Sequence, residues 1–435
     1  MSLRILAIGD LHLGRIPGRL PPSLHSDAAR VGPAGAWQRA VDLAIQESVT
    51  AVILAGDVAE SSEDYFEALP ILQAGAERLT AAGIQLVGIA GNHDGRLLPT
   101  LSQRVPEFKL LGQGGRWQSL TLEAGAEALT LWGWSFPDRH FSADPTRDFP
   151  GRSTTHPTLG LLHCHLDQVT SPYAPVASGR LRDINLDGWL LGHVHQPTPL
   201  TLPNPLGYLG SATGLHVGEA GPRGAWLLSV NDGRLSDLQH QPLAPLRWEH
   251  LDVDVSGVTD NVAVRDRFME RLERLSEALL HAPHAPRAVG LRVRLSGESD
   301  LPPTAFSLGE GDESSFPLPG AAHLTTFIES VAVEVRPTLS LTDLARRTDQ
   351  PGLLARRLLV LDRSADDPER QALLGEAAAV AQQAMKTGNW RRLHNDKLHQ
   401  EPDTEQIARW LRQTATTALR SMLRQQGQGQ GQGPA

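Results

Sequence analysis

The chain has 435 residues, of which 40% are apolar and 20% charged, values typical of a globular protein with two or three domains. No apolar stretch reaches membrane-spanning length, and a strand starts almost at residue 1, so we expect no membrane segment and no signal peptide. The net charge of −9 excludes a generally basic coat for nucleic acid and restricts any DNA binding to local patches and metal ions. The single cysteine, Cys164, excludes an internal disulfide framework and predicts a cytoplasmic protein.

Five short apolar runs, each typical of a buried strand, end in side chains that can bind a metal ion or a phosphate. Polar groups at the carboxyl ends of strands lie where open α/β sheets bind ligands. A single D-x-H or H-x-H pattern is weak evidence, because each occurs often by chance. The whole ordered set predicts a metal site. The alternative is that these residues are ordinary polar strand ends whose histidines are hydrogen-bonded within the protein. The runs are 3–9, 51–55, 84–90, 159–162 and 189–191; they end in Asp10-Leu11-His12, Gly56-Asp57, Gly91-Asn92-His93-Asp94, His163-Cys164-His165 and Gly192-His193-Val194-His195.

The segments between these runs predict the rest of an α/β domain over residues 1–245. Apolar residues at helical spacing predict helices over 36–48, 61–82 and 96–108, with Phe66 on the apolar face of the second helix. Alternating residues over 120–134 predict one strand of a second sheet, and 206–210 and 225–230 predict further strands. The loop 14–35 contains Arg15, Arg19, His25 and Arg30 and is either a solvated surface loop or a rim that touches phosphate. Cys164 is either a soft metal ligand or, as we expect, a small residue facing the core.

Composition changes at 241–245, where two prolines indicate a domain boundary. Strand patterns at 248–255, 289–295 and 331–335 flank a helical pattern at 262–280 and predict a small α+β domain over 246–340. Arg292 and Arg294 would lie on one exposed face of the middle strand. They are candidate phosphate contacts, although exposed edge strands also commonly carry arginine.

Residues 341–426 have a helical composition in which leucine- and alanine-rich segments alternate with arginine pairs. This pattern fits helices that dock on a partner, and it also fits a self-contained bundle. The Gly-Gln repeat at 427–435 predicts a disordered tail. The arginine pairs are Arg346-Arg347, Arg356-Arg357 and Arg391-Arg392.

The ordered motif set resembles the calcineurin-like metallophosphoesterase superfamily, and within it the SbcD-type DNA repair nucleases of the YhaO-like branch. The resemblance covers roughly the first 230 residues and implies a two-sheet α/β/β/α sandwich. It further implies a Mn²⁺-dependent DNA exonuclease and endonuclease that forms a homodimer through the 61–82 neighbourhood. The 246–340 domain would cap the site and contact DNA, and the C-terminal helices would grip an SMC-like coiled-coil ATPase of the SbcC type. A phosphoesterase for a small phosphodiester such as a cyclic nucleotide, and a non-catalytic scaffold, remain alternatives.

The resemblance also assigns the site residues. It implies two divalent ions bridged by Asp57, and carboxylate, amide and imidazole ligands suit Mn²⁺. His93 would donate a proton to the leaving oxygen, with Asp94 orienting its imidazole. The choice between His163 and His165 stays open, with the resemblance favouring His163. The implied ligands are Asp10, His12 and His195 for one ion, and Asn92, His163 and His193 for the other.

Overall fold

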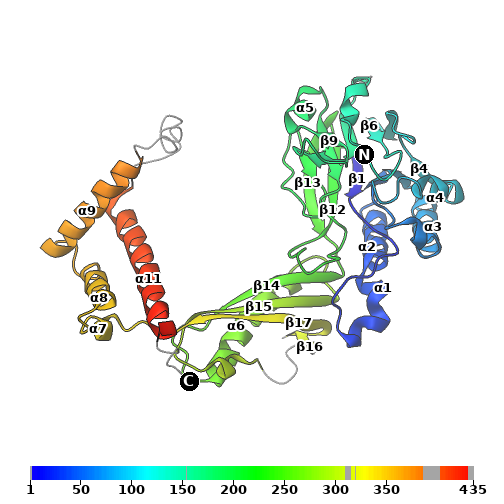
Figure 1. Ribbon diagram of the computed structural model, residues 1–435. Helices are drawn as coiled ribbons and strands as arrows, with labels where there is room; N and C mark the ends of the chain where they lie inside the picture. Colours follow the sequence, from blue (N-terminus) through cyan, green and yellow to red (C-terminus); the bar gives the residue numbers. More distant parts are fainter. Residues whose placement is uncertain (1, 153, 309–314, 319, 386–401, 430–435) are drawn as a thin grey trace. The chain divides into compact units, whose positions relative to one another are not determined.

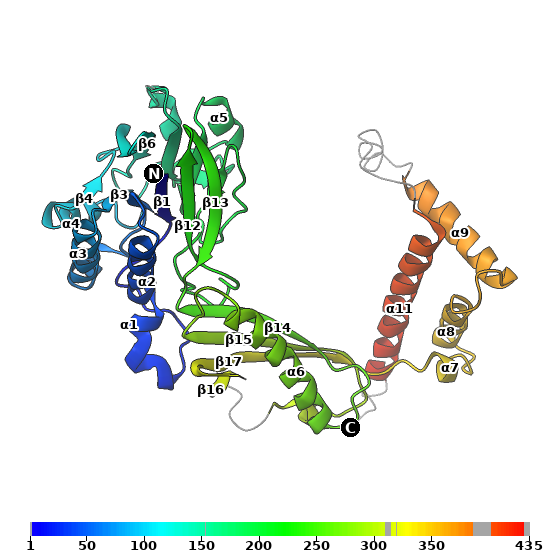
Figure 2. The same cartoon turned by 180° about the vertical axis from the view of Figure 1, so that it is seen from behind.

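The computed structural model describes residues 2–152, 154–308, 315–318, 320–385 and 402–429 (Figures 1 and 2). The chain forms two compact units, Met1–Val335 and Arg336–Ala435. The predicted boundary at 245/246 falls inside the first unit, where a new sheet begins, and the predicted boundary at 340/341 lies five residues after the division between the units. The finer division into domains stays a prediction.

The first sheet has the order β13-β12-β1-β2-β3-β4. Strands β1 to β4 run parallel, as crossover helices require, and β12 and β13 continue the sheet antiparallel. Its strands are β1 Leu3–Ile8, β2 Ala51–Ala55, β3 Gln85–Ile89, β4 Phe108–Leu110, β12 Gly224–Asn231 and β13 Arg234–Pro242.

The second sheet has the order β11-β10-β7-β6-β5, in which only β5 is antiparallel to its neighbour. Short elements connect it to the rest of the domain. Its strands are β5 Gln118–Ala124, β6 Glu127–Trp134, β7 Thr158–His163, β10 Gly188–Gly192 and β11 Leu206–Tyr208. The short elements are η1 Pro22–Asp27, α1 Ala28–Val31, η2 Ser62–Asp64, η3 Pro145–Asp148, β8 His165–Leu166, β9 Pro175–Val176 and α5 Ser178–Asp183.

The two sheets pack face to face, and helices cover the outer face of the first sheet (Figure 1). Strand β1 shows why, because its side chains alternate between two cores. Leu3 and Ile5 face the second sheet, whereas Leu6 and Ile8 face the helices. The predicted two-sheet α/β/β/α fold is therefore confirmed. The covering helices are α2 Pro33–Gln46, α3 Tyr65–Ala81 and α4 Leu98–Arg104.

Two sequence predictions for this domain were wrong in detail. Phe66 is 81% exposed, because the buried face of α3 carries Ala68, Leu72, Ala76 and Leu79 and residue 66 lies on the opposite side. The segment 120–134 is a hairpin and not one strand, since Gly125 adopts φ +63° between β5 and β6.

The middle part of the chain adds a four-stranded sheet of order β14-β15-β17-β16 with one helix. Strands β14 and β15 are parallel, as the predicted strand-helix-strand pattern requires. Trp248 of β14 is fully buried and packs against Phe327 and the loop residue Val217, which joins this sheet to the first domain. The elements are β14 Leu246–Asp254, α6 Asn261–Leu280, β15 Ala288–Glu298, η4 Pro303–Phe306, β16 Ser315–Leu318 and β17 Ala321–Arg336.

The second unit is helical and has its own apolar core around Leu358, Leu374 and Leu419. Helix α11 extends to Gly429, and the predicted disordered tail at 427–435 stays a prediction. Residues 430–435 and the Arg391-Arg392 pair lie outside the described residues. Among the helices that the structure describes, none is long and apolar enough to cross a membrane. The helices are α7 Leu341–Leu344, α8 Gln350–Val360, α9 Pro368–Met385 and α11 Thr404–Gly429.

Candidate metal centre

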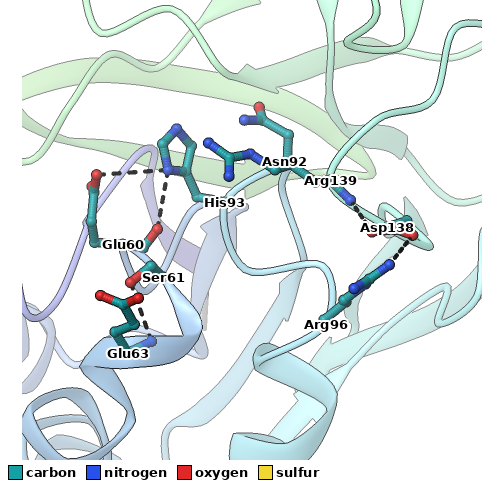
Figure 3. A pocket seen from close by; sticks show the side chains of 8 residues that line it. All are labelled: Glu60, Ser61, Glu63, Asn92, His93, Arg96, Asp138 and Arg139. Atoms are coloured by element: carbon teal, nitrogen blue, oxygen red, sulfur yellow. Dashed lines mark hydrogen bonds and ion pairs between the residues drawn. The ribbon is translucent and has the colours of Figure 1, made fainter.

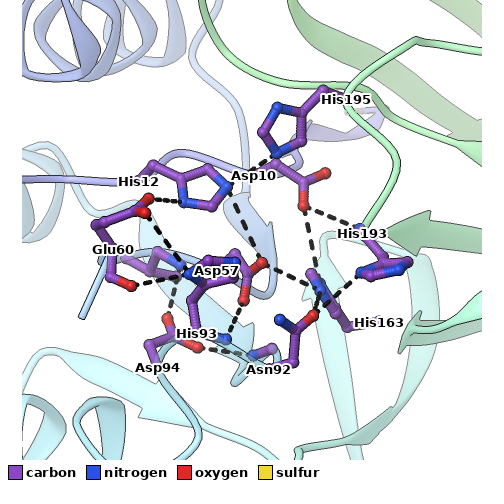
Figure 4. Close-up of polar contacts among 12 residues, drawn as sticks. Asp10, His12, Asp57, Glu60, Asn92, His93, Asp94, His163, His193 and His195 are labelled. Atoms are coloured by element: carbon purple, nitrogen blue, oxygen red, sulfur yellow. Dashed lines mark hydrogen bonds and ion pairs between the residues drawn. The ribbon is translucent and has the colours of Figure 1, made fainter. Parts of the chain in front are cut away.

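The carboxyl ends of β1, β2, β3, β7 and β10 bring all the predicted ligands to one place (Figure 4). Parallel strands that share an edge present their following loops together, so residues almost 200 positions apart in the sequence become neighbours. The predicted ligands are Asp10 and His12 after β1, Asp57 after β2, Asn92 after β3, His163 at the end of β7, and His193 and His195 after β10.

The backbone at these strand ends is strained. Asp10, His12, Asp57 and His193 all have positive φ, at 42°, 52°, 47° and 102°. Such conformations cost non-glycine residues about 1–3 kcal/mol each, and they concentrate at functional sites. Only glycine fits at position 91, because a Cβ there would lie 2.2 Å from Asp57 Oδ1.

One group of donors consists of Asp10, His12 and His195, whose ligand atoms lie within 4.8 Å of one another. The Nε2 atoms of His12 and His195 face each other at 3.0 Å. Asp10 is 1% exposed, and its Oδ2 has no hydrogen-bond partner among the described residues. A buried carboxylate oxygen without a donor is expensive, so it indicates a place for a cation.

The second group surrounds Asn92. Its Oδ1 lies 3.0 Å from both His163 Nε2 and His193 Nδ1. Asp57 stands between the two groups, with Oδ2 3.3 Å from His163 Nε2 and 3.9 Å from His12 Nε2. The predicted bridging position of Asp57 therefore agrees with the geometry.

The buried carboxylates of the cluster shift the pKa values of neighbouring histidines and favour a positive charge among them. Burial opposes charging His163, but the Asp57 and Asp10 carboxylates outweigh burial and raise its pKa to about 9. Burial and the neighbouring His163 lower the pKa of His193 to about 3. The donor set of carboxylate, amide and imidazole, without thiolate, fits divalent metal ions. Divalent ions held by these residues would neutralise phosphate charge and lower the pKa of a water nucleophile.

His93 stands beside this cluster and is still a third exposed. Its Nδ1 donates to the Glu60 backbone carbonyl at 3.0 Å and lies 3.7 Å from Glu60 Oε1. That contact places the Nδ1 hydrogen, so Nε2 is the atom left to carry a transferable proton. His93 borders a pocket of about 410 Å³ (Figure 3), lined by Glu60, Ser61, Glu63, Asn92, His93, Arg96, Asp138 and Arg139.

The predicted role of Asp94 was wrong. Its carboxylate does not contact His93 in the described structure; it accepts hydrogen bonds from the backbone of Val58 at 2.6 Å, Ala59 at 3.2 Å and Gly91 at 2.7 Å. Asp94 thus ties the loop after β2 to the loop after β3 and supports Asp57 indirectly. Neighbouring residues in a tight turn point in different directions, which explains the error.

Two other residues of the β7 end have clear positions. His165 Nδ1 bonds to Ser171 Oγ at 2.9 Å, whereas His163 is fully buried against Asn92, which favours His163 as the ligand. Cys164 is buried in an apolar cluster with Trp134 and Leu191, as expected of a core residue. Burial raises the pKa of its thiol.

The candidate DNA contacts are exposed but paired. Arg292 Nε donates to Glu329 at 2.8 Å, and Arg294 binds Asp252 in a bidentate pair at 2.7 and 2.8 Å. Strand β15 lies inside its sheet and is not the edge strand considered from the sequence. In the 14–35 loop, Arg15 pairs with Glu60 at 3.3 Å and Arg19 with Glu329 at 3.6 Å.

Sequence reasoning missed two carboxylates of the site. Glu60 lies 2.7 Å from His12 Nδ1, and Glu219 accepts from His195 Nδ1 at 2.7 Å. Glu60 follows Asp57 by three residues and was within reach of a motif search, whereas Glu219 lies in a glycine-rich loop without a local signal. The buried Arg223, which donates to the His195 carbonyl, was also missed.

Among solved structures, a dimetal phosphatase from Danio rerio is similar, with a TM-score of 0.34 and 14% identity, over 55% of this chain and 98% of that chain. The calcineurin-like phosphoesterase YfkN from Bacillus subtilis has a TM-score of 0.35 and 13% identity, over 63% of this chain and 99% of that chain.

Comparison of sequences identifies the family more specifically than comparison of structures. The uncharacterized metallophosphoesterase YhaO of Bacillus subtilis (strain 168) is 29% identical over 250 residues, which cover 54% of this chain and 58% of YhaO. The match therefore spans less than two thirds of that relative. Residues 3–197 match the calcineurin-like phosphoesterase family, and residues 248–310 match the middle domain of metallophosphoesterase YhaO. The chain thus carries a calcineurin-like metallophosphoesterase domain, a metal-dependent hydrolase fold, followed by a YhaO-type middle domain.

Proposed function

We propose that the protein is a Mn²⁺-dependent exonuclease and endonuclease of the SbcD/YhaO type that hydrolyses phosphodiester bonds in DNA. The observation that carries this proposal is the convergence of two donor groups on Asp57, with His93 at their side facing an open pocket. That arrangement offers a phosphodiester a binding place for its anionic oxygens and a proton source for its leaving oxygen.

The chain's own residues divide the reaction between them. A water oxygen attacks phosphorus and loses a proton to the solvent, while the bond from phosphorus to the leaving oxygen breaks. The leaving oxygen takes the proton from His93, which is reprotonated from the solvent before the next turnover. Glu60 holds the His93 ring through its backbone carbonyl at 3.0 Å, so the ring presents Nε2 to the substrate. Asp94 keeps the loops that carry Asp57 and Asn92 in register through its backbone hydrogen bonds.

The parts of the chain beyond the first domain favour DNA over a small phosphodiester. The middle sheet carries Arg292 and Arg294, 41% and 50% exposed at their side chains, which we propose as DNA phosphate contacts. The Asp252 partner of Arg294 is 56% exposed and exchangeable for phosphate, because surface ion pairs contribute only about 0–1 kcal/mol. The Glu329 partner of Arg292 is only 5% exposed, so Arg294 is the stronger of the two candidates. We also propose a homodimer, with the exposed Phe66 of α3 in the interface.

The helical unit offers a surface for a second partner. A groove of about 280 Å³ is lined by Leu354, Leu361, Leu411 and other residues of α8, α9 and α11, with Val380 68% exposed at its border. Trp410 on α11 is 49% exposed. We propose that the coiled coil of an SbcC-type SMC-like ATPase binds here, since apolar grooves accept the apolar face of amphipathic helices.

The test is hydrolysis by the full chain, first stripped of metal by chelation and then supplied with Mn²⁺. The substrates are linear duplex DNA, hairpin DNA, a cyclic nucleotide and bis(p-nitrophenyl) phosphate. We expect DNA cleavage that disappears in Asp57→Ala, whose metal content also falls. Cleavage of the small phosphodiesters without DNA cleavage would replace the nuclease with a small-substrate phosphoesterase, and inactivity on all four would refute the enzyme.

A further inference from the structure

Two imidazoles of the first donor group have a carboxylate close to Nδ1, as a hydrogen bond in His195 and as a close ion-pair contact without hydrogen-bond geometry in His12. His12 Nδ1 lies 2.7 Å from Glu60 Oε2, and His195 Nδ1 lies 2.7 Å from Glu219 Oε1 (Figure 4 shows the His12 pair). The hydrogen bond to Glu219 fixes the hydrogen of His195 on Nδ1, and the Glu60 carboxylate beside His12 Nδ1 favours the same form of that ring. In this form the lone pair of each ring is on Nε2.

The two lone pairs then meet. The Nε2 atoms of His12 and His195 are 3.0 Å apart, beside the unpartnered Oδ2 of Asp10. Two acceptor nitrogens and a buried carboxylate oxygen repel one another unless a proton or a metal ion lies among them, and the three donors are placed so that one metal ion can replace that proton. Glu60 and Glu219 also add negative charge behind the rings, which makes both imidazoles stronger donors to a cation.

Glu219 is itself anchored. Its Oε2 accepts from the Leu215 backbone at 2.9 Å, and its backbone carbonyl accepts from Arg223 Nε at 3.3 Å. Arg223 is 1% exposed and also donates to the carbonyl of His195 and to Gln196 Oε1. The loop that carries Glu219 and the loop that carries His195 are therefore clamped together by one buried guanidinium.

The second donor group lacks this support in the described structure. His163 Nδ1 faces the neutral backbone carbonyl of Ala55 at 3.1 Å, and Asn92 brings a neutral amide where the first group has Asp10. The two groups share Asp57. A ligand atom of Asp10 also lies within 4.8 Å of those of Asp57 and His163. The difference between the groups is therefore the two carboxylates behind the rings of the first.

We propose that Glu60 and Glu219 are positioning residues that make the Asp10 subsite the tighter of two unequal metal subsites. This inference rests on the proposed pair of divalent ions, but not on the DNA substrate. The tight subsite would keep its ion at low metal concentration, while the Asn92 subsite would fill and empty as the metal concentration changes.

Calorimetric titration of the metal-free full chain with Mn²⁺ tests the proposal without any substrate. We expect two binding steps of different affinity, with Asn92→Ala removing the weaker step. Glu219→Gln keeps a hydrogen-bond acceptor but removes the charge, and Glu219→Ala removes both. Both variants should weaken the tighter step, Ala more than Gln, by roughly 10- to 100-fold. Glu60→Gln should act on the same step.

Glu63→Gln is the matched control, because Glu63 lines the neighbouring pocket and its side chain has no described contact with a predicted ligand. Melting of each metal-free variant separates loss of metal affinity from loss of folding. Equal affinities in the unmodified protein, or Glu variants that weaken only the step removed by Asn92→Ala, would overturn the inference. Two unequal steps in a protein that leaves DNA intact would refute the nuclease and leave this inference standing.

Discussion

Three histidines of the site have a role set by the partner of the second ring nitrogen. His163 is held by a backbone carbonyl, His195 by the Glu219 carboxylate, and His93 by the carbonyl of Glu60. The first two present a nitrogen to the buried cluster, whereas His93 presents one to the open pocket. Similar side chains a few ångströms apart can therefore bind metal or carry a proton.

His93→Ala should keep both metals and lose cleavage by on the order of a hundredfold or more, because the leaving oxygen loses its proton donor. Metal analysis and turnover of the purified variant are the measurements. The loss should shrink for a substrate whose leaving group needs no proton, such as bis(p-nitrophenyl) phosphate. If the variant has lost an ion, His93 is a ligand and its assignment as proton donor is wrong.

The ligands could be predicted from the sequence because each lies at or just after the carboxyl end of a strand, so a local pattern encodes each position. Glu219 could not be predicted, because it reaches His195 only through the folding of the loop before β12. Asp94 was predicted to orient His93 because the two residues are adjacent in the sequence. Its carboxylate instead accepts hydrogen bonds from the backbone of Val58 and Gly91.

At the scale of elements, buried strands were predicted well and their connections less well. The run Ala51–Ala55 is buried at every position, so its apolar sequence alone is enough to predict a strand. Strand β13 was missed because its side chains are mostly polar, although Asp232 and Gly233 at φ 51° and 66° form the turn that an Asp-Gly pair predicts. Phe66 was predicted on the buried face of α3 because it is apolar and near the start of the helical pattern. The spacing does not show where the helix begins, and α3 begins only at Tyr65.

His240 in β13 makes the first sheet sensitive to acid. Burial, assisted by the charge of Arg223, lowers the pKa of His240 to about 4 from an ordinary value of 6.5. The folded protein therefore binds fewer protons than the unfolded chain between these values, so stability is complete above pH 6.5 and falls as the pH drops towards 4. His240 Nε2 has no hydrogen-bond partner in the described part of the chain, and its ring packs against Trp226.

His240→Phe keeps an aromatic ring against Trp226 and removes the titrating group. We expect its melting temperature to fall less between pH 6.5 and pH 4 than that of the unmodified protein. The exposed His250 lies in β14 and supplies the matched control, His250→Phe. An unchanged pH dependence in His240→Phe would show that other groups, such as the carboxylates and His193, cause the acid sensitivity.

The whole molecule consists of two compact units with separate cores, and all the predicted ligands lie in the first. Metal should therefore stabilise only the Met1–Val335 unit, by about 2.7 kcal/mol when free Mn²⁺ is a hundredfold above its dissociation constant. Calorimetry should show a transition that moves upward with Mn²⁺ and returns with chelator, while the Arg336–Ala435 transition stays in place. A single transition that moves as one would mean that the units unfold together.

The division between the units also shows where the chain can be truncated to remove the helical unit and keep the first unit whole. A chain ending at Pro337 keeps β17, which ends at Arg336, and removes every residue of the helical core. It should still hydrolyse small phosphodiesters with Mn²⁺, but it should neither bind the SbcC-type ATPase in a pull-down nor show ATP-stimulated DNA processing. The full chain with Val380→Glu is the matched variant, because Val380 is 68% exposed at the groove and its replacement leaves the core intact.

The two variants separate docking from folding. Loss of ATPase binding in both, with Mn²⁺-dependent hydrolysis retained, places the partner on the groove of the helical unit. A truncated protein that is insoluble or inactive on every substrate would instead mean that the helices complete the fold of the first unit. Continued binding by the truncated chain would move the docking site into Met1–Val335, where the exposed Phe66 of α3 would be the next surface to test.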